Sequence, residues 1–285
     1  MAEINQEYHE KYYERFDAYS RFLHVLVIIS FISLATTGMI IKFSGVGVFQ
    51  TLSKILGGYE VTGFIHRTAA IITFIYFFLH LTYLLRKKIK RGVPASSFLK
   101  GENSLVPNKR DLTEFVQTMK WFFGKGPRPQ YGRWTYWEKF DYFAVFWGVA
   151  VIGFSGLILW FPEFFTSLGF PGWLINVATI IHSDEALLAV GFIFTIHFFN
   201  THFRPDKFPM DTVIFTGKVS VEELKEDRPR EFSLIMQSEE LQKKFSNEAP
   251  SFALTKAARI FGFSALTLGI ILIALIIYSM IFLYQ

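Results

Sequence analysis

Five long apolar segments constrain the fold of this 285-residue chain more than any other feature of its sequence. A helix needs about 20 predominantly apolar residues to cross a bilayer, and each segment meets that length. We expect the spans at Phe22–Ile41, Phe64–Leu85, Phe140–Phe161, Trp173–Phe199 and Ile260–Leu283. The sequence therefore predicts an all-α membrane protein with five transmembrane helices.

The composition agrees with a membrane protein and narrows the chemistry that it can perform. Hydrophobic residues make up 51% of the chain, and the mean hydropathy is +0.31, above that of a typical soluble domain. There is no cysteine. This excludes a disulfide, a zinc site or iron–sulfur cluster held by cysteine, and a covalently attached haem. Any redox centre must use other ligands.

The basic residues indicate how the chain is oriented. Residues 86–139 contain thirteen Lys and Arg against four Asp and Glu, whereas residues 162–172 contain no Lys or Arg and residues 43–62 contain only Lys54. Basic loops stay on the cytoplasmic side. The formal charge of +5 thus reflects membrane topology rather than nucleic-acid binding. We expect a bacterial inner-membrane protein with a cytoplasmic N-terminus and no cleavable signal peptide, because the first 21 residues are polar and charged.

The same pattern predicts how the chain is organised. Residues 1–21 form a cytoplasmic N-terminal segment, and residues 22–203 form a four-helix domain with a cytoplasmic loop at 86–139. Residues 204–259 form a cytoplasmic connection with a short surface helix over Leu234–Phe245, and residues 260–285 carry the fifth helix.

Six of the seven histidines lie inside or at the edge of the predicted spans: His24, His66, His80, His182, His197 and His202. Ionisable residues in membrane helices are costly and usually serve a site. In an ideal α-helix, His66 and His80 differ by about −40° and about 21 Å, and His182 and His197 by about +60° and about 22 Å. Spans two and four run in the same direction, so two levels result. His66 lies level with His182 at the outer level, and His80 lies level with His197 at the inner level, where His24 competes with His80.

Two facing imidazoles at each level favour haem over zinc, which usually takes three or four converging ligands. A b-type haem takes two axial nitrogens on opposite faces of a flat ring. Small residues in spans two and four can give the ring room: Ala69, Ala70, Ala186, Ala189 and Gly191. His202 lies about 140° from His197 on an ideal α-helix, so we expect it to be an interfacial or proton-handling residue. A third haem held by His80 and His202 is an alternative.

Four stretches of the sequence carry a resemblance to a known family. They are RFLHVLVIISFISLATTG, GFIHR, SGLILWFP and IIHSDEALLAVGFIFTIHFFNTH. Together they resemble the di-haem cytochrome b subunit of formate dehydrogenases, in a group that includes the membrane cytochromes of nickel–iron hydrogenases and thiosulfate reductases. The likeness covers roughly residues 20–220.

The resemblance implies a haem-binding four-helix bundle with two non-covalent haem b groups. It implies His66 and His182 as axial iron ligands of the outer haem, and His24 and His197 as those of the inner haem. The chain departs from the family pattern by adding His80 and a fifth span. The cytochrome b of quinol–cytochrome c oxidoreductases places two histidines on each of two helices, which would select His80 instead of His24.

The resemblance also implies a function. The chain would be the electron-transfer subunit of a quinone-linked oxidoreductase complex, exchanging electrons between menaquinone or ubiquinone and a partner subunit. That partner would be an iron–sulfur, molybdopterin or multihaem cytochrome c protein. Two alternatives remain, a proton-conducting or transport protein that uses the histidines as a relay, and a structural anchor.

Four charged residues near the spans have candidate roles. Arg67 can neutralise a haem propionate or anchor the helix at the interface. Glu138 can relay a quinol proton or be solvated at the surface. Asp184 and Glu185 can hydrogen-bond a ligand imidazole or contact a partner subunit.

Overall fold

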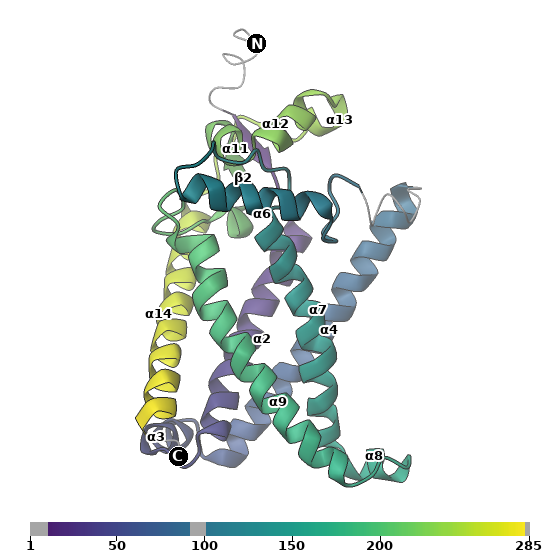
Figure 1. Ribbon diagram of the computed structural model, residues 1–285, viewed down its shortest axis with the longest axis vertical. Coiled ribbons are helices and arrows are strands. Elements are labelled where there is room, and N and C mark those ends of the chain that lie inside the picture. The colour runs from purple at the N-terminus through teal and green to yellow at the C-terminus, as the bar shows by residue number, and fades with distance from the viewer. Residues whose placement is uncertain (1–10, 92–100, 283–285) are drawn as a thin grey trace. The chain divides into compact units, whose positions relative to one another are not determined.

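The computed structural model describes residues 11–91 and 101–282, so the first ten residues of the predicted N-terminal segment and Gln285 lie outside the described residues. Five helices are long and apolar enough to cross a membrane. They are α2 (Ala18–Lys42), α4 (Tyr59–Arg91), α7 (Tyr136–Trp160), α9 (Trp173–Phe192) and α14 (Phe252–Phe282), as Figure 1 shows. The predictions of an all-α membrane protein and of five spans are confirmed.

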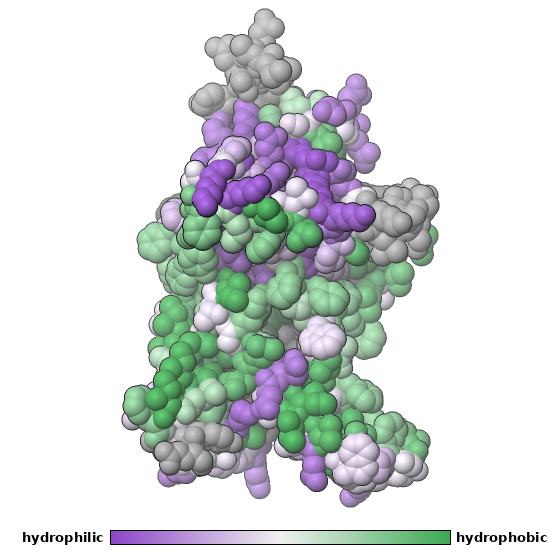
Figure 2. Space-filling view, in the orientation of Figure 1, coloured by the Kyte–Doolittle hydropathy of each residue, from purple (hydrophilic) through white to green (hydrophobic). Residues whose placement is uncertain are grey.

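The surfaces of these helices are suited to lipid. Large apolar side chains such as Phe78, Phe154 and Leu188 are more than half exposed, and Figure 2 shows apolar side chains covering much of the long helices on the face in view. Helices satisfy their backbone hydrogen bonds internally, so they can expose such side chains to hydrocarbon. A surface of this kind in water would be an aggregation site.

The chain divides into two compact units. Unit 1 comprises Leu81–Phe143 and Thr212–Ala258 together with the N-terminal stretch up to Phe22. Unit 2 comprises Leu23–His80, Ala144–Asp211 and the chain from Arg259 onward. Unit 2 therefore holds all six histidines that the sequence analysis singled out.

The fourth span does not remain an α-helix to its end. After Phe192 it continues as two π-helical segments, η1 (Ile193–His197) and η2 (Phe199–Phe203). The π-helix is rare and usually marks a functional site. Here it carries His197 and His202, so the helical geometry that we assumed for these two residues in the sequence analysis does not apply.

The core of unit 2 joins the π segment to the fifth span. Phe194 and Phe198 pack in one cluster with Met39 of α2 and Leu272 of α14. A Cβ atom on Gly269 of α14 would lie 2.4 Å from the Phe194 ring, which leaves room only for glycine. The fifth span thus packs closely against the point where the fourth span leaves α-helical geometry. Two short helices connect the spans of unit 2, α3 (Gly47–Ile55) and α8 (Pro162–Ser167).

Unit 1 contains a small sheet that the sequence analysis did not predict. Strand β1 (Tyr12–Glu14) pairs antiparallel with β2 (Lys218–Ser220) on one side and with β3 (Phe245–Ser246) on the other. The Tyr13 side chain is almost fully buried against Leu224 and Ile235. The N-terminal segment therefore folds together with the connection that precedes the fifth span.

That connection is structured over most of its length. In place of the single surface helix expected over Leu234–Phe245, it contains several short elements. They are α10 (Val213–Thr216), α11 (Val221–Asp227), α12 (Pro229–Met236) and α13 (Glu239–Gln242), besides the strands β2 and β3. Serine side chains at Ser220 and Ser238 cap α11 and α13, and Pro229 begins α12 at a position where proline costs no hydrogen bond.

Buried ion pairs hold unit 1 together. The Arg228 guanidinium donates two hydrogen bonds to the Glu138 carboxylate, at 2.8 and 3.0 Å. Arg133 bonds Glu231 at 2.9 Å and donates to the carbonyl of Arg15 at 2.6 Å. Burial alone would lower the pKa of Arg228, but the Glu138 carboxylate outweighs burial and raises that pKa above its usual value. Glu138 is therefore an ion-pair partner and not the solvated carboxylate favoured by its place in the sequence.

We expect Arg228→Met to destabilise unit 1 by about 3 kcal/mol, because it leaves the Glu138 carboxylate without its countercharge. Hydrogen exchange followed by mass spectrometry should show faster exchange in β2 and α12. The matched control is Arg230→Met, whose partner Glu102 is about half exposed (side chain 48% accessible). Exposed pairs contribute about 0–1 kcal/mol, so equal exchange in the two variants would contradict a role for the buried pair.

Candidate functional site

His66 of α4 and His182 of α9 face one another in unit 2. Their ring centroids lie 6.1 Å apart, with the ring planes at 76°. The sequence analysis predicted this pairing from helical spacing, and the structure brings the two side chains together. Both lie in spanning helices, where an imidazole must find partners for its nitrogens within the protein.

Each of the two rings is fixed through its Nδ1 atom. His182 Nδ1 lies 2.9 Å from the carbonyl oxygen of Ile152, which can only accept, so His182 is protonated at Nδ1. His66 Nδ1 lies 2.9 Å from the hydroxyl of Thr37. That hydroxyl donates its own proton to the carbonyl of Ser33 at 2.6 Å, so it accepts from His66. Both rings therefore keep the Nε2 lone pair for another ligand.

Two glycines give these rings their space. A Cβ atom on Gly156 of α7 would lie 2.9 Å from Cε1 of His182, closer than real Cβ contacts. A Cβ atom on Gly38 of α2 would lie 3.4 Å from Cε1 of His66. Gly38 and Gly156 belong to the quoted stretches ending TTG and beginning SGL, and Thr37 and Ser155 stand beside them. Ser155 Oγ lies 3.4 Å from His182 Nδ1.

The geometry of the pair fits a metal held between two imidazoles. Two rings that bind one metal from opposite sides, each with a nitrogen–metal distance of about 2 Å, place their centroids about 6 Å apart, as His66 and His182 do. Metal-binding histidines usually donate the other ring N–H to a carbonyl or hydroxyl, which fixes the tautomer. His66 and His182 both do this. The residues present thus fit the axial positions of a haem.

A second group of histidines lies elsewhere in unit 2. His24 of α2 is within electrostatic range of both His197 and His202 on the π segment. His80 of α4 instead packs its ring against Phe146 of α7, with centroids 6.3 Å apart. His24 and His197, the pair that the resemblance implies for the inner haem, thus lie near enough to interact electrostatically, and their role as inner ligands stays a prediction.

The π segment changes the expected position of His202. On an α-helix five residues correspond to about 140°, which would turn His202 away from His197. A π-helix has about 4.4 residues per turn, so the same five residues correspond to about 50°. On an ideal π-helix, His202 would therefore share a side of the helix with His197. The buried Nδ1 of His202 has no hydrogen-bond partner in the part of the chain that the structure describes. The expected angle of about 140° assumed an α-helix, which this segment is not, so the interfacial role of His202 stays a prediction.

The charged residues near the His66–His182 pair have other partners. Asp184 binds Lys42 at 3.0 Å, and Glu185 accepts a hydrogen bond from the Trp147 indole at 3.4 Å. Arg67 lies over the Trp160 ring, 5.9 Å from its centroid. The sequence offered Asp184 or Glu185 as the hydrogen-bond partner of the His182 imidazole, but the group that accepts the Nδ1–H of His182 is the backbone carbonyl of Ile152.

Thr37, Gly156 and the Ile152 carbonyl support the two imidazoles, and none of them was predicted from the sequence. Thr37 and Gly156 belong to the stretches that resemble the cytochrome b family. The local sequence therefore indicated the region of the site, but not which atom contacts which ring. A backbone carbonyl such as that of Ile152 leaves no mark on the side-chain sequence, and only the structure identifies it.

Paired imidazoles inside an apolar helical membrane domain are typical of b-type cytochromes. The sequence matches the family described as prokaryotic cytochrome b561 over residues 15–204, and the chain belongs to this family. No curated protein matches the chain. Membership implies haem b as cofactor and electron transfer in a bacterial membrane as the general activity.

We expect Gly156→Ala to weaken haem retention roughly tenfold or more, because the new methyl group would displace the His182 ring. Purified protein should then contain less haem b, measured by the pyridine haemochrome assay against protein concentration. The control is Gly148→Ala in the same helix, where the nearest atom to the new methyl group is Ile152 Cδ1 at 3.9 Å. Equal haem loss in both variants would mean that α7 tolerates no added methyl group and that His182 is not the cause.

Thr37→Val should weaken haem binding about 10-fold to 100-fold, because it removes the acceptor for the His66 Nδ1–H. A redox titration should also show a changed midpoint potential for the affected haem. Thr36→Val is the matched control, since the buried Thr36 hydroxyl has no hydrogen-bond partner among the described residues. A change of the same size in both variants would show that the hydroxyl contact does not orient His66.

Proposed function

We propose that the chain holds two haem b groups and passes electrons between the quinone pool and a partner redox subunit. The observation that carries this proposal is the His66–His182 pair, whose 6.1 Å centroid separation and Nδ1 hydrogen bonds suit two axial ligands of one iron. When bound, haem b supplies reversible one-electron transfer at its iron.

In the proposed outer site, His66 and His182 would hold the haem iron through Nε2. The Thr37 hydroxyl and the Ile152 carbonyl accept the Nδ1 protons, so they fix the ring planes and make both imidazoles better electron donors. Gly38 and Gly156 leave space beside the rings. The apolar helices around the pair keep water away and lower the local dielectric, which affects the potential.

In the proposed inner site, His24 and His197 would be the iron ligands. The electrostatic interaction between them supports this pair, and the packing of His80 against Phe146 favours His24 over His80. His80 stays the alternative ligand. Sites that follow the spacing of His182 and His197 lie about 20 Å apart along the membrane normal, which covers much of a bilayer.

The quinone, menaquinone or ubiquinone, is proposed to react near the inner site, with the N-terminus in the cytoplasm. A partner subunit carrying an iron–sulfur, molybdopterin or multihaem centre would hold the other end of the electron path. Glu138 is not proposed as the proton acceptor for the quinol, because its carboxylate is engaged by Arg228.

A proton relay through the histidines is the competing function. A relay needs rings that give up and accept protons at both nitrogens. His66 and His182 each direct Nδ1–H to a fixed acceptor, which is the arrangement of a ligand rather than of a relay. Together with the family membership, this favours electron transfer.

The difference spectrum of the purified protein before and after dithionite tests the proposal. We expect a reduced α band typical of haem b and two haems per chain, with both haems reduced by a menaquinol or ubiquinol analogue. Absence of the band would refute the cytochrome function. A single haem per chain would refute the inner site, and a band that no quinol develops would refute the quinone role.

Separate substitutions identify the inner ligand. His24→Ala should lose the inner haem and keep the outer one, so the haem content falls from about two to about one per chain. His80→Ala is the matched comparison and should keep both. The reverse result would assign the inner site to His80.

A further inference from the structure

Helix α6 (Lys109–Phe122) of unit 1 exposes its apolar face and packs charged side chains against its own unit, the reverse of a helix on a water-soluble protein. At 100° per residue, six large apolar side chains fall within about 80° of Leu112 on either side. They are Leu112, Phe115, Val116, Met119, Phe122 and Phe123, and all are exposed, with Leu112 at 68% and Phe122 at 74%.

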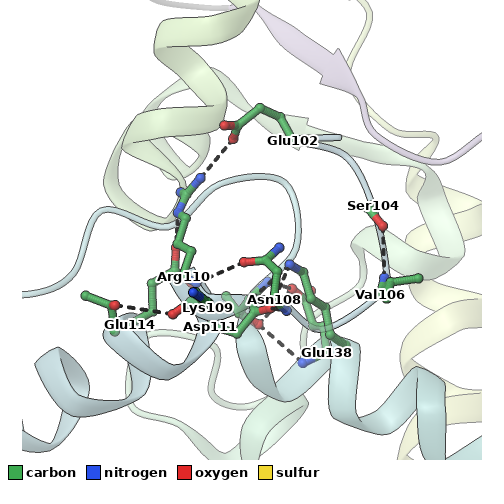
Figure 3. A network of polar contacts seen from close by, with 12 residues as sticks. Glu102, Ser104, Val106, Asn108, Lys109, Arg110, Asp111, Glu114 and Glu138 are labelled. Carbon is green, nitrogen blue, oxygen red and sulfur yellow. Dashed lines mark hydrogen bonds and ion pairs between the residues drawn. The ribbon is translucent and has the colours of Figure 1, made fainter. Parts of the chain in front are cut away.

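The opposite face of α6 carries the ion pairs that hold the helix in unit 1, besides Trp121, which is 44% exposed. Arg110 binds Glu114 and Glu102, each at 2.8 Å, and Lys139 binds Asp111 at 2.8 Å. Figure 3 shows Arg110, Asp111 and Glu114 gathered at the start of the helix, where Asn108 and Asp111 form a capping box. The ion pairs fix the rotation of α6, and the apolar face is therefore held outward.

The contacts of Phe115 place this apolar face close to a membrane-spanning helix. Its ring packs edge-on against Tyr136, with centroids 5.5 Å apart. Tyr136 is the first residue of α7, a candidate span, and tyrosine is enriched where spans enter the membrane. Within unit 1, α6 runs crosswise to the first turns of α7 (Figure 1). The exposed face thus lies at the level of the membrane interface.

The charges around the apolar face match a lipid headgroup layer. Lys109 and Lys120 lie about 60° and 80° from Leu112 on the same edge of the face, and Lys125 follows the helix; all three are exposed. Lysine places its stem along apolar surface and its ammonium in the headgroups, whereas protein–protein interfaces are depleted in lysine. The arginine of α6, Arg110, is already paired with acidic residues of unit 1.

We propose that α6 is an interfacial helix that binds the membrane surface at the Tyr136 end of α7. The six apolar side chains enter the acyl boundary, about 5–10 Å below the headgroups, and Lys109, Lys120 and Lys125 bind anionic phospholipid. The proposal concerns lipid binding by a loop and does not depend on how many haems the chain holds.

The absence of cysteine allows each position to be labelled singly in the full chain. Leu112→Cys and Phe122→Cys test the apolar face, and Gln117→Cys is the matched control, because Gln117 is exposed about 140° away on the same helix. Each variant carries a nitroxide label in vesicles of phosphatidylcholine and phosphatidylglycerol. The visible spectrum of each variant should match that of the unsubstituted chain, which shows that the labelled protein is folded.

We expect the ratio of oxygen accessibility to nickel-chelate accessibility to be several-fold higher at positions 112 and 122 than at 117. Equal ratios at all three positions would mean that the face meets water and would overturn the proposal. Exclusion of both reagents at 112 and 122 would mean that protein covers the face, and would overturn it also.

A second measurement tests the anionic lipid. In vesicles of phosphatidylcholine alone, the label at 112 should lie less deep than with phosphatidylglycerol present. The triple variant Lys109→Gln, Lys120→Gln, Lys125→Gln should abolish that difference. An unchanged depth in both lipids for the chain with its lysines intact would overturn the part of the proposal that concerns anionic lipid.

Discussion

An imidazole inside a bilayer must have both nitrogens satisfied by the protein, and much of unit 2 follows from this constraint. At the His66–His182 pair, each Nδ1 donates to a fixed acceptor, the Thr37 hydroxyl or the Ile152 carbonyl. This leaves two Nε2 lone pairs that would be costly in hydrocarbon without a partner. A metal between the rings is the partner that suits their separation. The glycine beside each ring then has a reason, because a side chain at Gly156 would displace His182.

The π segment shows how far the fourth span departs from regular geometry to position its histidines. Each π-helical residue turns by about 18° less than an α-helical one, so the four steps from Ile193 to His197 remove about 70° of rotation. On ideal geometry, the +60° offset between His182 and His197 would therefore fall to near zero, which would turn the two histidines to the same side of the helix. The wider backbone is supported by close packing, in which Gly269 of α14 admits the Phe194 ring. The fifth span, which has no histidine, thus contributes to the site by supporting its backbone.

Much of this fold was predictable from the sequence, because the length of an apolar segment is enough to identify a membrane-spanning helix. The pairing of His66 with His182 was predictable too, since both lie on regular α-helix and only their spacing mattered. The π segment was not, because a helix that is apolar on every side gives no periodicity from which a change of pitch could be seen. The sheet of unit 1 joins Tyr13 to Val219 and Phe245, and pairings so distant in sequence leave no local signal in strands of two or three residues. The ion pair of Glu138 was not predictable either, because its partner Arg228 lies ninety positions away in the sequence.

The two units treat charge in opposite ways, and each treatment follows from the solvent around it. Unit 2 exposes apolar side chains such as Leu188. Its charged side chains form single ion pairs, such as Lys42 with Asp184. Unit 1 buries arginines and carboxylates in networks around Glu231 and Glu138. Burying such pairs brings little net stability compared with apolar packing, but each pair has one favourable geometry, so the network fixes how the short elements are oriented.

Helix α6 illustrates the consequence, because its rotation is set by Arg110 and Asp111 on the polar side and not by its apolar side. Apart from the contact of Phe115 with Tyr136, the apolar face of α6 is exposed and held outward. In the proposed arrangement, the lipid interface beside Tyr136 supplies the contacts that stabilise it.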